Sequence, residues 1–161
     1  MRHIITTLIA LVTLLAASAA GAADLTSETY DKLVDKSGNI KLPKHHRLNW
    51  AHLGSWVVAD AKAPGYGFHD VYTQPDAVKA YRKTGKFPDG TMLIKEIRHI
   101  VSSTQTTGDV LNAGDKKLWF VMVKNNKHRF ADNMHWVIGW GWALFMADKP
   151  EANVSKGFKE T

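Results

Sequence analysis

The chain has 161 residues with 21 basic and 15 acidic side chains, which give a formal net charge of +6, and it contains no cysteine. This length allows one domain with a core of its own and is short for two. Without cysteine the chain has no disulfide and no thiolate for zinc or an iron–sulfur cluster, so core packing must stabilise it. The basic residues are scattered, and no run of five or more marks a nucleic-acid-binding surface, so we expect no nucleic-acid partner.

The first 23 residues have the composition of a secretory signal peptide. Arg2 and His3 precede an apolar run over residues 4–17, and small residues follow it. The apolar run is shorter than the ~20 residues that span a bilayer, which argues against a membrane anchor. We therefore expect cleavage of residues 1–23, a mature domain over residues 24–161, and a periplasmic or secreted protein.

The first half of the mature chain predicts short helices joined by extended segments. Apolar residues at helical spacing predict each helix. The last helix has Pro75 at its first position and Gly85 just past its end, the usual asymmetry of helix termini. Its residues Ala77, Val78 and Tyr81 would face inward. In chain order the elements are a helix over 25–34, an extended connector over 40–43, a helix over 45–53, a loop over 59–67, a strand over 68–73 and a helix over 75–83.

The second half alternates strands with turns. Pro88, Asp89 and Gly90 signal a turn, and segments rich in β-branched and aromatic residues predict the strands. Together the elements predict an α+β single domain, mainly an antiparallel sheet of four to five strands with a few short helices. In chain order they are a strand over 91–101, a polar loop over 102–115, a strand over 118–124, a connection over 125–134, an aromatic strand over 136–146 and a polar tail over 148–161.

The long strand places a lysine among apolar residues. Because side chains alternate along a strand, Lys95 shares one face with Leu93 and Ile97. Lys95 either extends its ammonium group to water over an apolar stem or lies in a desolvated pocket, where its pKa falls and its amine becomes nucleophilic. Glu96 and Arg98, on the opposite face, are expected to form an ion pair of little energetic weight.

The eight histidines do not form a recognisable metal site. None stands at the HxH, HxxxH or HExxH spacing that brings two imidazoles to one ion, and the adjacent His45 and His46 would diverge by about 100° on a helix. The sequence therefore predicts no metal ligand among them. Motifs of serine nucleophiles, dinucleotide sites and phosphate-binding loops are also missing.

The six tryptophans are the most distinctive feature of the composition. On a continuous strand over 136–146, Trp136, Trp140 and Trp142 would share one face at even spacing. Such rings either pack a core or line a flat apolar pocket for a planar ligand. The sequence alone leaves both interpretations open.

Six short segments follow one another in a fixed order. They are LPK at 42–44 with Arg47 and Trp50 nearby, FHDVY at 68–72, residues 75–85, FPDGTMLIKEI at 87–97, VMVK at 121–124 and GWGW at 139–142. In this order and spacing they resemble the cytochrome P-460 family, over most of the mature chain. The most specific part is the turn and strand that carry DGT and KE.

The resemblance implies a periplasmic, mainly β, usually dimeric domain that holds a c-type haem. It also implies that the protein oxidises hydroxylamine and that a lysine is covalently bonded to the porphyrin. Lys95 stands where that lysine is found, so it is the candidate for both the catalytic and the cofactor-binding role. Relatives of the cytochrome c′-beta type share the fold but bind nitric oxide or similar gases without the cross-link.

One feature of the family is missing from this sequence. Family members attach haem c through a CxxCH motif near the C-terminus, whose histidine ligates the iron, whereas this sequence has no cysteine. We expect a chain truncated before that motif, with a haem-free relative as the alternative. In the form given, the chain alone would not be active.

The sequence therefore predicts a haem oxidoreductase acting on hydroxylamine or a related small nitrogen compound. The alternatives are a gas-binding or electron-transfer cytochrome without turnover, and a haem-free exported domain that binds a small apolar ligand. The expected partners are a small nitrogen substrate or gas, a periplasmic electron-transfer protein and a second copy of the chain in a homodimer.

Overall fold

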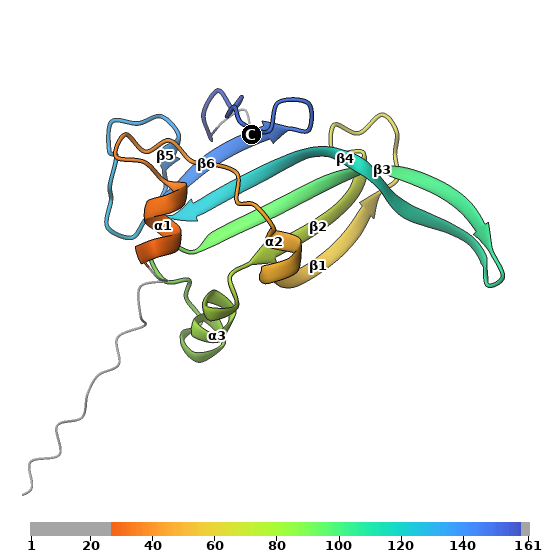
Figure 1. The fold of residues 1–161 in the computed structure, drawn as a ribbon, viewed down its shortest axis with the longest axis horizontal. Coiled ribbons are helices and arrows are strands. Elements are labelled where there is room, and N and C mark those ends of the chain that lie inside the picture. The colour runs from red at the N-terminus through yellow and green to blue at the C-terminus, as the bar shows by residue number, and fades with distance from the viewer. Residues whose placement is uncertain (1–26, 159–161) are drawn as a thin grey trace, which may run out of the picture.

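A computed structural model describes residues 27–158, so the expected signal peptide lies outside the described residues. Their centre is a single six-stranded sheet in the order β1-β2-β3-β4-β6-β5, antiparallel throughout (Figure 1). Three short helices accompany it, and the expected fold class is confirmed. No helix within 27–158 has the length and apolarity to cross a membrane. The elements are α1 (Ser27–Leu33), α2 (His46–Asn49), β1 (Ala51–Val58), β2 (Gly67–Thr73), α3 (Pro75–Thr84), β3 (Met92–Gln105), β4 (Gly108–Lys124), β5 (Trp136–Val137) and β6 (Trp140–Met146).

One face of the sheet carries the hydrophobic core. Alternate residues of β3, β4 and β6 are buried there, and the segment after α1 crosses this face and adds Val34 and Ile40. The indole of Trp136 donates a 2.8 Å hydrogen bond to the carbonyl of Gly38, which ties that segment to the C-terminal strands. Burial of each large apolar side chain stabilises the fold by about 1.5–3 kcal/mol. The buried core residues are Val34, Ile40, Met92, Ile94, Trp119, Val121, Val123, Trp136, Ala143 and Phe145.

The middle of the sheet contains a hairpin longer than expected. β3 and β4 pair from Met92 opposite Val123 to Gln105 opposite Gly108, with register shifts on both sides of Arg98. The polar loop expected over 102–115 is therefore wrong, because that segment is strand. Residues 100–113, here called the arm, extend beyond the other strands (Figure 1). Since both faces of the arm meet solvent, its sequence lacks the apolar alternation that identifies a strand packed on a core.

The helix expected over 45–53 is also wrong. The helix α2 covers only four residues, the backbone becomes extended at Trp50, and β1 begins at Ala51 as an edge strand of the sheet. The pairing of β1 with β2 shifts between His52 and Gly54, so apolar and polar residues do not alternate along β1. This irregularity removes the period-2 pattern and leaves an apolar spacing that imitates a helix.

The aromatic strand expected over 136–146 is divided by a turn. Ile138 and Gly139 have φ values of 49° and 77°, so the chain reverses between β5 and β6 and Trp136 pairs with Gly141. Trp136 therefore lies on the core face, while Trp142 lies on the opposite face. The expected shared face of three tryptophans is wrong because β-branched residues seldom adopt positive φ, so isoleucine does not signal such a turn.

The remaining elements agree closely with the sequence-based expectations. The strand over 68–73 and the helix over 75–83 are confirmed within one residue, and Gly85 follows α3 with a φ of 68°. Within that helix, Ala77 is fully buried as expected, but Tyr81 is 45% exposed. The ring of Tyr81 instead packs against Phe87, with 4.6 Å between ring centroids.

Candidate functional site

The face of the sheet opposite the core bears a pocket of about 220 Å³. Its lining is apolar and aromatic except for one lysine. Lys95 is central in the lining, because it pairs with Val71 of β2 on one side and Phe120 of β4 on the other. Thus four adjacent strands, far apart in sequence, build the pocket. The lining residues are Val71, Leu93, Lys95, Phe120, Met122 and Trp142.

The amine of Lys95 lies in apolar surroundings. Its Nζ is 4.4 Å from the centroid of the Phe120 ring, and across residues 27–158 it makes no ion pair or hydrogen bond. Burial lowers the pKa of Lys95, because the pocket replaces the water that would solvate an ammonium group. A lysine in this setting reaches its neutral, nucleophilic form more easily than a surface lysine.

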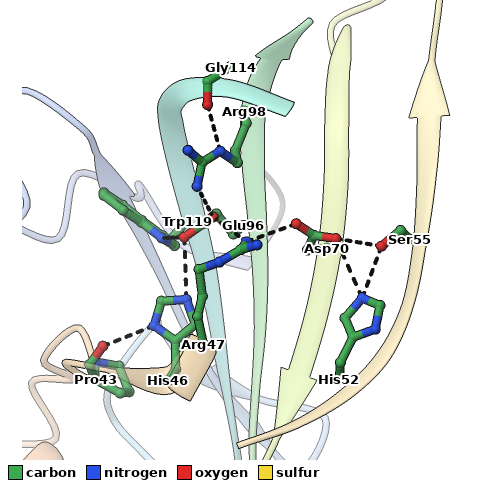
Figure 2. A network of polar contacts seen from close by, with 10 residues as sticks. All are labelled: Pro43, His46, Arg47, His52, Ser55, Asp70, Glu96, Arg98, Gly114 and Trp119. Atoms are coloured by element: carbon green, nitrogen blue, oxygen red, sulfur yellow. Dashed lines mark hydrogen bonds and ion pairs between the residues drawn. The ribbon is translucent and has the colours of Figure 1, made fainter. Parts of the chain in front are cut away.

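On the core face, the next residue along β3 is a carboxylate with no exposed surface, Glu96. Its Oε1 accepts hydrogen bonds from Arg47 at 2.8 Å and Arg98 at 3.1 Å (Figure 2). Its Oε2 accepts one from the indole of Trp119 at 2.8 Å and lies 3.3 Å from Nε2 of His46. Burial alone would raise the pKa of Glu96, but these four partners lower it to about 2.

The network continues from Glu96 across the sheet to β1. Arg47 also donates a 2.9 Å hydrogen bond to Asp70, and Asp70 accepts one of 2.5 Å from the hydroxyl of Ser55 (Figure 2). The imidazole of His52 lies 2.9 Å from that hydroxyl. Burial raises the pKa of Asp70, but hydrogen bonds from Ser55 and Arg47 outweigh it and lower the pKa below its ordinary value. The network therefore joins α2 to four strands.

The sequence located part of this network. The expected Glu96–Arg98 ion pair is confirmed, and its carboxylate is fully buried. Its small energetic weight stays a prediction. The same alternation that paired them also placed Glu96 on the face of Ile94, which was a sign of burial. Sequence reasoning missed His46, Asp70 and Trp119 as partners, since the distant pairing of β2 and β4 with β3 brings them together.

The network and the pocket are coupled through one strand. Glu96 is held from several sides on the core face, and Lys95 is its neighbour in the chain. Because successive side chains point to opposite faces, fixing Glu96 also fixes the direction of Lys95 into the pocket. Glu96 therefore acts as a positioning residue for Lys95.

The other candidate residues lie apart from the pocket or at its edge. Of the three tryptophans expected together, only Trp142 lines the pocket, and its buried indole Nε1 has no hydrogen-bond partner among residues 27–158. Within the described range, no group of three or more His, Asp or Glu side chains could hold a metal ion. His69 instead stacks on Trp56 with 5.0 Å between ring centroids, and its Nε2 lies 2.7 Å from the Gly65 carbonyl oxygen.

Comparison with known proteins adds a family match. The family described as Cytochrome P460 matches residues 43–161. No curated protein matches the chain. The matched range contains all six strands, the pocket and the Glu96 network.

Replacing Glu96 with glutamine tests the network through stability. Glu96→Gln leaves Arg47 and Arg98 without their shared charge, so we expect the free energy of unfolding at neutral pH to fall by about 2–4 kcal/mol. Urea denaturation followed by tryptophan fluorescence measures this. The exposed carboxylate Glu151 gives the matched control, and Glu151→Gln should change the free energy of unfolding by less than about 0.5 kcal/mol.

The same pair of variants has a distinct pH dependence. The folded pKa of Glu96, about 2, lies below its ordinary value of 4.5, so its contribution is complete above pH 4.5 and declines as the pH falls toward 2. As the pH falls from 4.5 towards 2, the free energy of unfolding of wild type and of Glu151→Gln should lose the contribution of Glu96. The free energy of unfolding of Glu96→Gln should not show this loss. If the free energy of unfolding depended on pH identically in all three proteins, the lowered pKa of Glu96 would be contradicted.

Proposed function

The chain belongs to the cytochrome P460 family and is a haem protein of that family; on this premise we propose that it oxidises hydroxylamine or a related small nitrogen compound in the periplasm. The observation that carries the proposal is the amine of Lys95, which lies without an ion pair in an apolar pocket. Its position agrees with the resemblance, which assigns a lysine–porphyrin bond to Lys95.

The pocket residues have the chemistry to bind the face of a porphyrin, and the pocket of about 220 Å³ would hold part of such a ring. Phe120, Met122 and Trp142 offer aromatic and polarisable contacts to a flat apolar ring. The indole Nε1 of Trp142, buried without a hydrogen-bond partner among the described residues, would be a donor for a polar group of the ring. The lining contains no histidine, so these side chains account for binding the ring and not for ligating its iron.

Each residue of the site would have a defined task. When bound, haem supplies the redox-active iron at which a small nitrogen compound gives up electrons. Lys95, whose pKa is lowered by burial, would supply the nitrogen of the covalent bond to the ring. The apolar lining would exclude water from the site, and Glu96 would keep the direction of Lys95 constant.

A second function has a specific observation in its favour. The ammonium of Lys95 lies over the face of Phe120, and such a contact stabilises the protonated lysine by roughly 0.5–2 kcal/mol. A lysine held in this way can remain unbonded, as in a gas-binding or electron-transfer cytochrome without turnover. The pocket without haem would suit a small apolar ligand, which is the third alternative.

Mass spectrometry and kinetics together separate these functions. The protein is produced from its whole gene in a periplasm that matures c-type haem, and its peptides are weighed after digestion. We expect the peptide with Lys95 to carry the mass of haem. Lys95→Arg, which keeps the charge but has no free amine, should lose that mass and about 10- to 100-fold of the hydroxylamine oxidation rate measured with a one-electron acceptor.

The exposed Lys62 provides the control for this experiment. Lys62→Arg should leave both the haem mass and the rate unchanged. An unmodified Lys95 peptide together with full turnover would contradict the assigned role of Lys95. An unmodified peptide in a haem-loaded protein without turnover would support the gas-binding alternative instead.

We also propose that the arm joins two copies of the chain in a homodimer. A two-stranded ribbon is marginally stable by itself, and the arm contacts no other strand beyond its own pair. Val101 and Leu111, on opposite faces of the ribbon, are 49% and 47% exposed. A second copy could cover both residues and support the ribbon.

Sedimentation equilibrium tests this assembly. Wild type should sediment as a dimer, and Leu111→Asp should weaken dimerisation at least about tenfold because a carboxylate is costly to bury in an interface. Asp109→Asn, also on the arm but at a polar position, is the control and should remain dimeric. A monomeric wild type, or a dimer unaffected by Leu111→Asp, contradicts the arm as the interface.

A further inference from the structure

The segment after β6 carries a modification motif that the proposed function does not use. Asn153, Val154 and Ser155 have the pattern Asn-X-Ser, with X other than proline, in which asparagine accepts an N-linked glycan in exported proteins. The chain has seven asparagines, and only Asn153 is followed two residues later by serine or threonine. An acidic residue, Glu151, stands two residues before it. The sequence therefore contains one candidate glycan site.

The structure places this motif on the surface. Glu151, Asn153 and Val154 are exposed, and residues 153–156 form neither helix nor strand. The backbone N–H of Val154 donates a 2.8 Å hydrogen bond to the carbonyl of Leu144, which holds the segment beside β6 (Figure 1). A second enzyme could therefore reach the motif without opening the core.

The two ends of the Asn153 side-chain amide have different surroundings. Its oxygen Oδ1 accepts hydrogen bonds from the backbone N–H of Leu144 at 3.0 Å, from the backbone N–H of Ser155 at 3.0 Å and from the hydroxyl of Ser155 at 2.8 Å. Across residues 27–158 its nitrogen Nδ2 has no hydrogen-bond partner. The oxygen is thus held in place while the nitrogen is available.

A purely structural role explains the oxygen but not the nitrogen. Holding the N–H of Leu144 and turning the chain at Ser155 require only an oxygen that accepts hydrogen bonds, which aspartate would also supply. A glycan is attached to Nδ2, and the side chain remains an amide with its carbonyl oxygen. All three hydrogen bonds to Oδ1 can therefore persist in the modified protein.

The hydroxyl of Ser155 has a chemical reason to stand two residues after Asn153. A hydroxyl has one hydrogen and Oδ1 only accepts, so Ser155 donates to Asn153. The Nδ1 of His135 lies 3.1 Å from the same hydroxyl and can donate to it, which fixes its orientation. Donors around Oδ1 stabilise the negative charge that reaches this oxygen when Nδ2 gives up a proton. The arrangement therefore favours Nδ2 as a nucleophile.

From these contacts we propose that Asn153 accepts an N-linked glycan from an oligosaccharyltransferase that uses a saccharide activated on a lipid diphosphate. The inference rests on the periplasmic location in the proposed function and does not depend on haem. Nδ2 forms a bond to the anomeric carbon of the saccharide, and the bond between that carbon and the diphosphate oxygen breaks. The lipid diphosphate leaves with the electron pair, Nδ2 gives one proton to a base of the transferase, and nothing is oxidised or reduced. The exposed carboxylate of Glu151 gives the transferase a charge to recognise.

Mass spectrometry of the whole chain tests the site. The chain is produced with its own leader in a bacterial periplasm that contains such a transferase, its lipid-linked saccharide and a reporter glycoprotein. Wild type should gain the mass of one saccharide, located on Asn153 by fragmentation. Asn153→Asp, which keeps the oxygen acceptor, and Ser155→Ala should each lower the modified fraction at least about tenfold, whereas Ser155→Thr, which keeps the hydroxyl, should retain it.

Matched variants separate the site from other asparagines and from a loss of folding. Asn49→Gln, at an exposed asparagine outside the motif, should leave the modified fraction unchanged. Glu151→Gln should lower it at least about threefold, because the recognised charge is removed. The circular dichroism spectrum of Asn153→Asp should equal that of wild type. An unmodified wild type beside a modified reporter overturns the proposal, as does a mass gain that persists in Asn153→Asp.

The experiment distinguishes this inference from the proposed function. A chain that carries the saccharide but shows no haem on Lys95 and no oxidation contradicts the proposed function alone. A haem-loaded, active protein without the saccharide contradicts this inference alone. A chain that retains residues 1–23 contradicts the export on which both rest.

Discussion

The buried carboxylate of Glu96 is the constraint on which the rest of the structure depends. A charge with no exposed surface is destabilising unless it is paired and hydrogen-bonded, and Glu96 meets that requirement with partners from three elements. Arg47 comes from α2, Arg98 from β3 itself and Trp119 from β4. Satisfying one carboxylate therefore requires the helix, the strand register and the core-face packing to be correct at the same time.

The two faces of β3 differ in whether their charged side chain has partners. On the core face the charge of Glu96 is fully compensated, while on the pocket face the amine of Lys95 has only the ring of Phe120 beside it. The paired Glu96 on the core face keeps the strand in place. The amine of Lys95 on the pocket face is left free to react. The lysine–porphyrin bond that we propose would need both properties, since a covalent bond to a large ring demands an amine that is reactive and well oriented.

Local sequence signals predicted what depends on local physics. The alternation around Lys95, the turn before β3 and the limits of α3 follow from neighbouring residues and agree with the structure. The arm and β1 were missed because neither buries a regular apolar face. The turn at Ile138 was missed because its residue type rarely takes that conformation, and this error placed Trp136 on the wrong face. Partners of Glu96 such as Trp119 depend on strand pairing, which one residue pattern cannot specify.

The central claim is that the pocket desolvates the amine of Lys95 and thereby prepares it for chemistry. A pH titration of the side-chain amine by nuclear magnetic resonance, with nitrogen-labelled lysine and the signal assigned by its loss in Lys95→Arg, measures this directly. The account predicts a midpoint below the ordinary pKa of 10.5, because burial disfavours the ammonium form. A midpoint at or above 10.5 would contradict it and would return Lys95 to the class of solvated surface lysines.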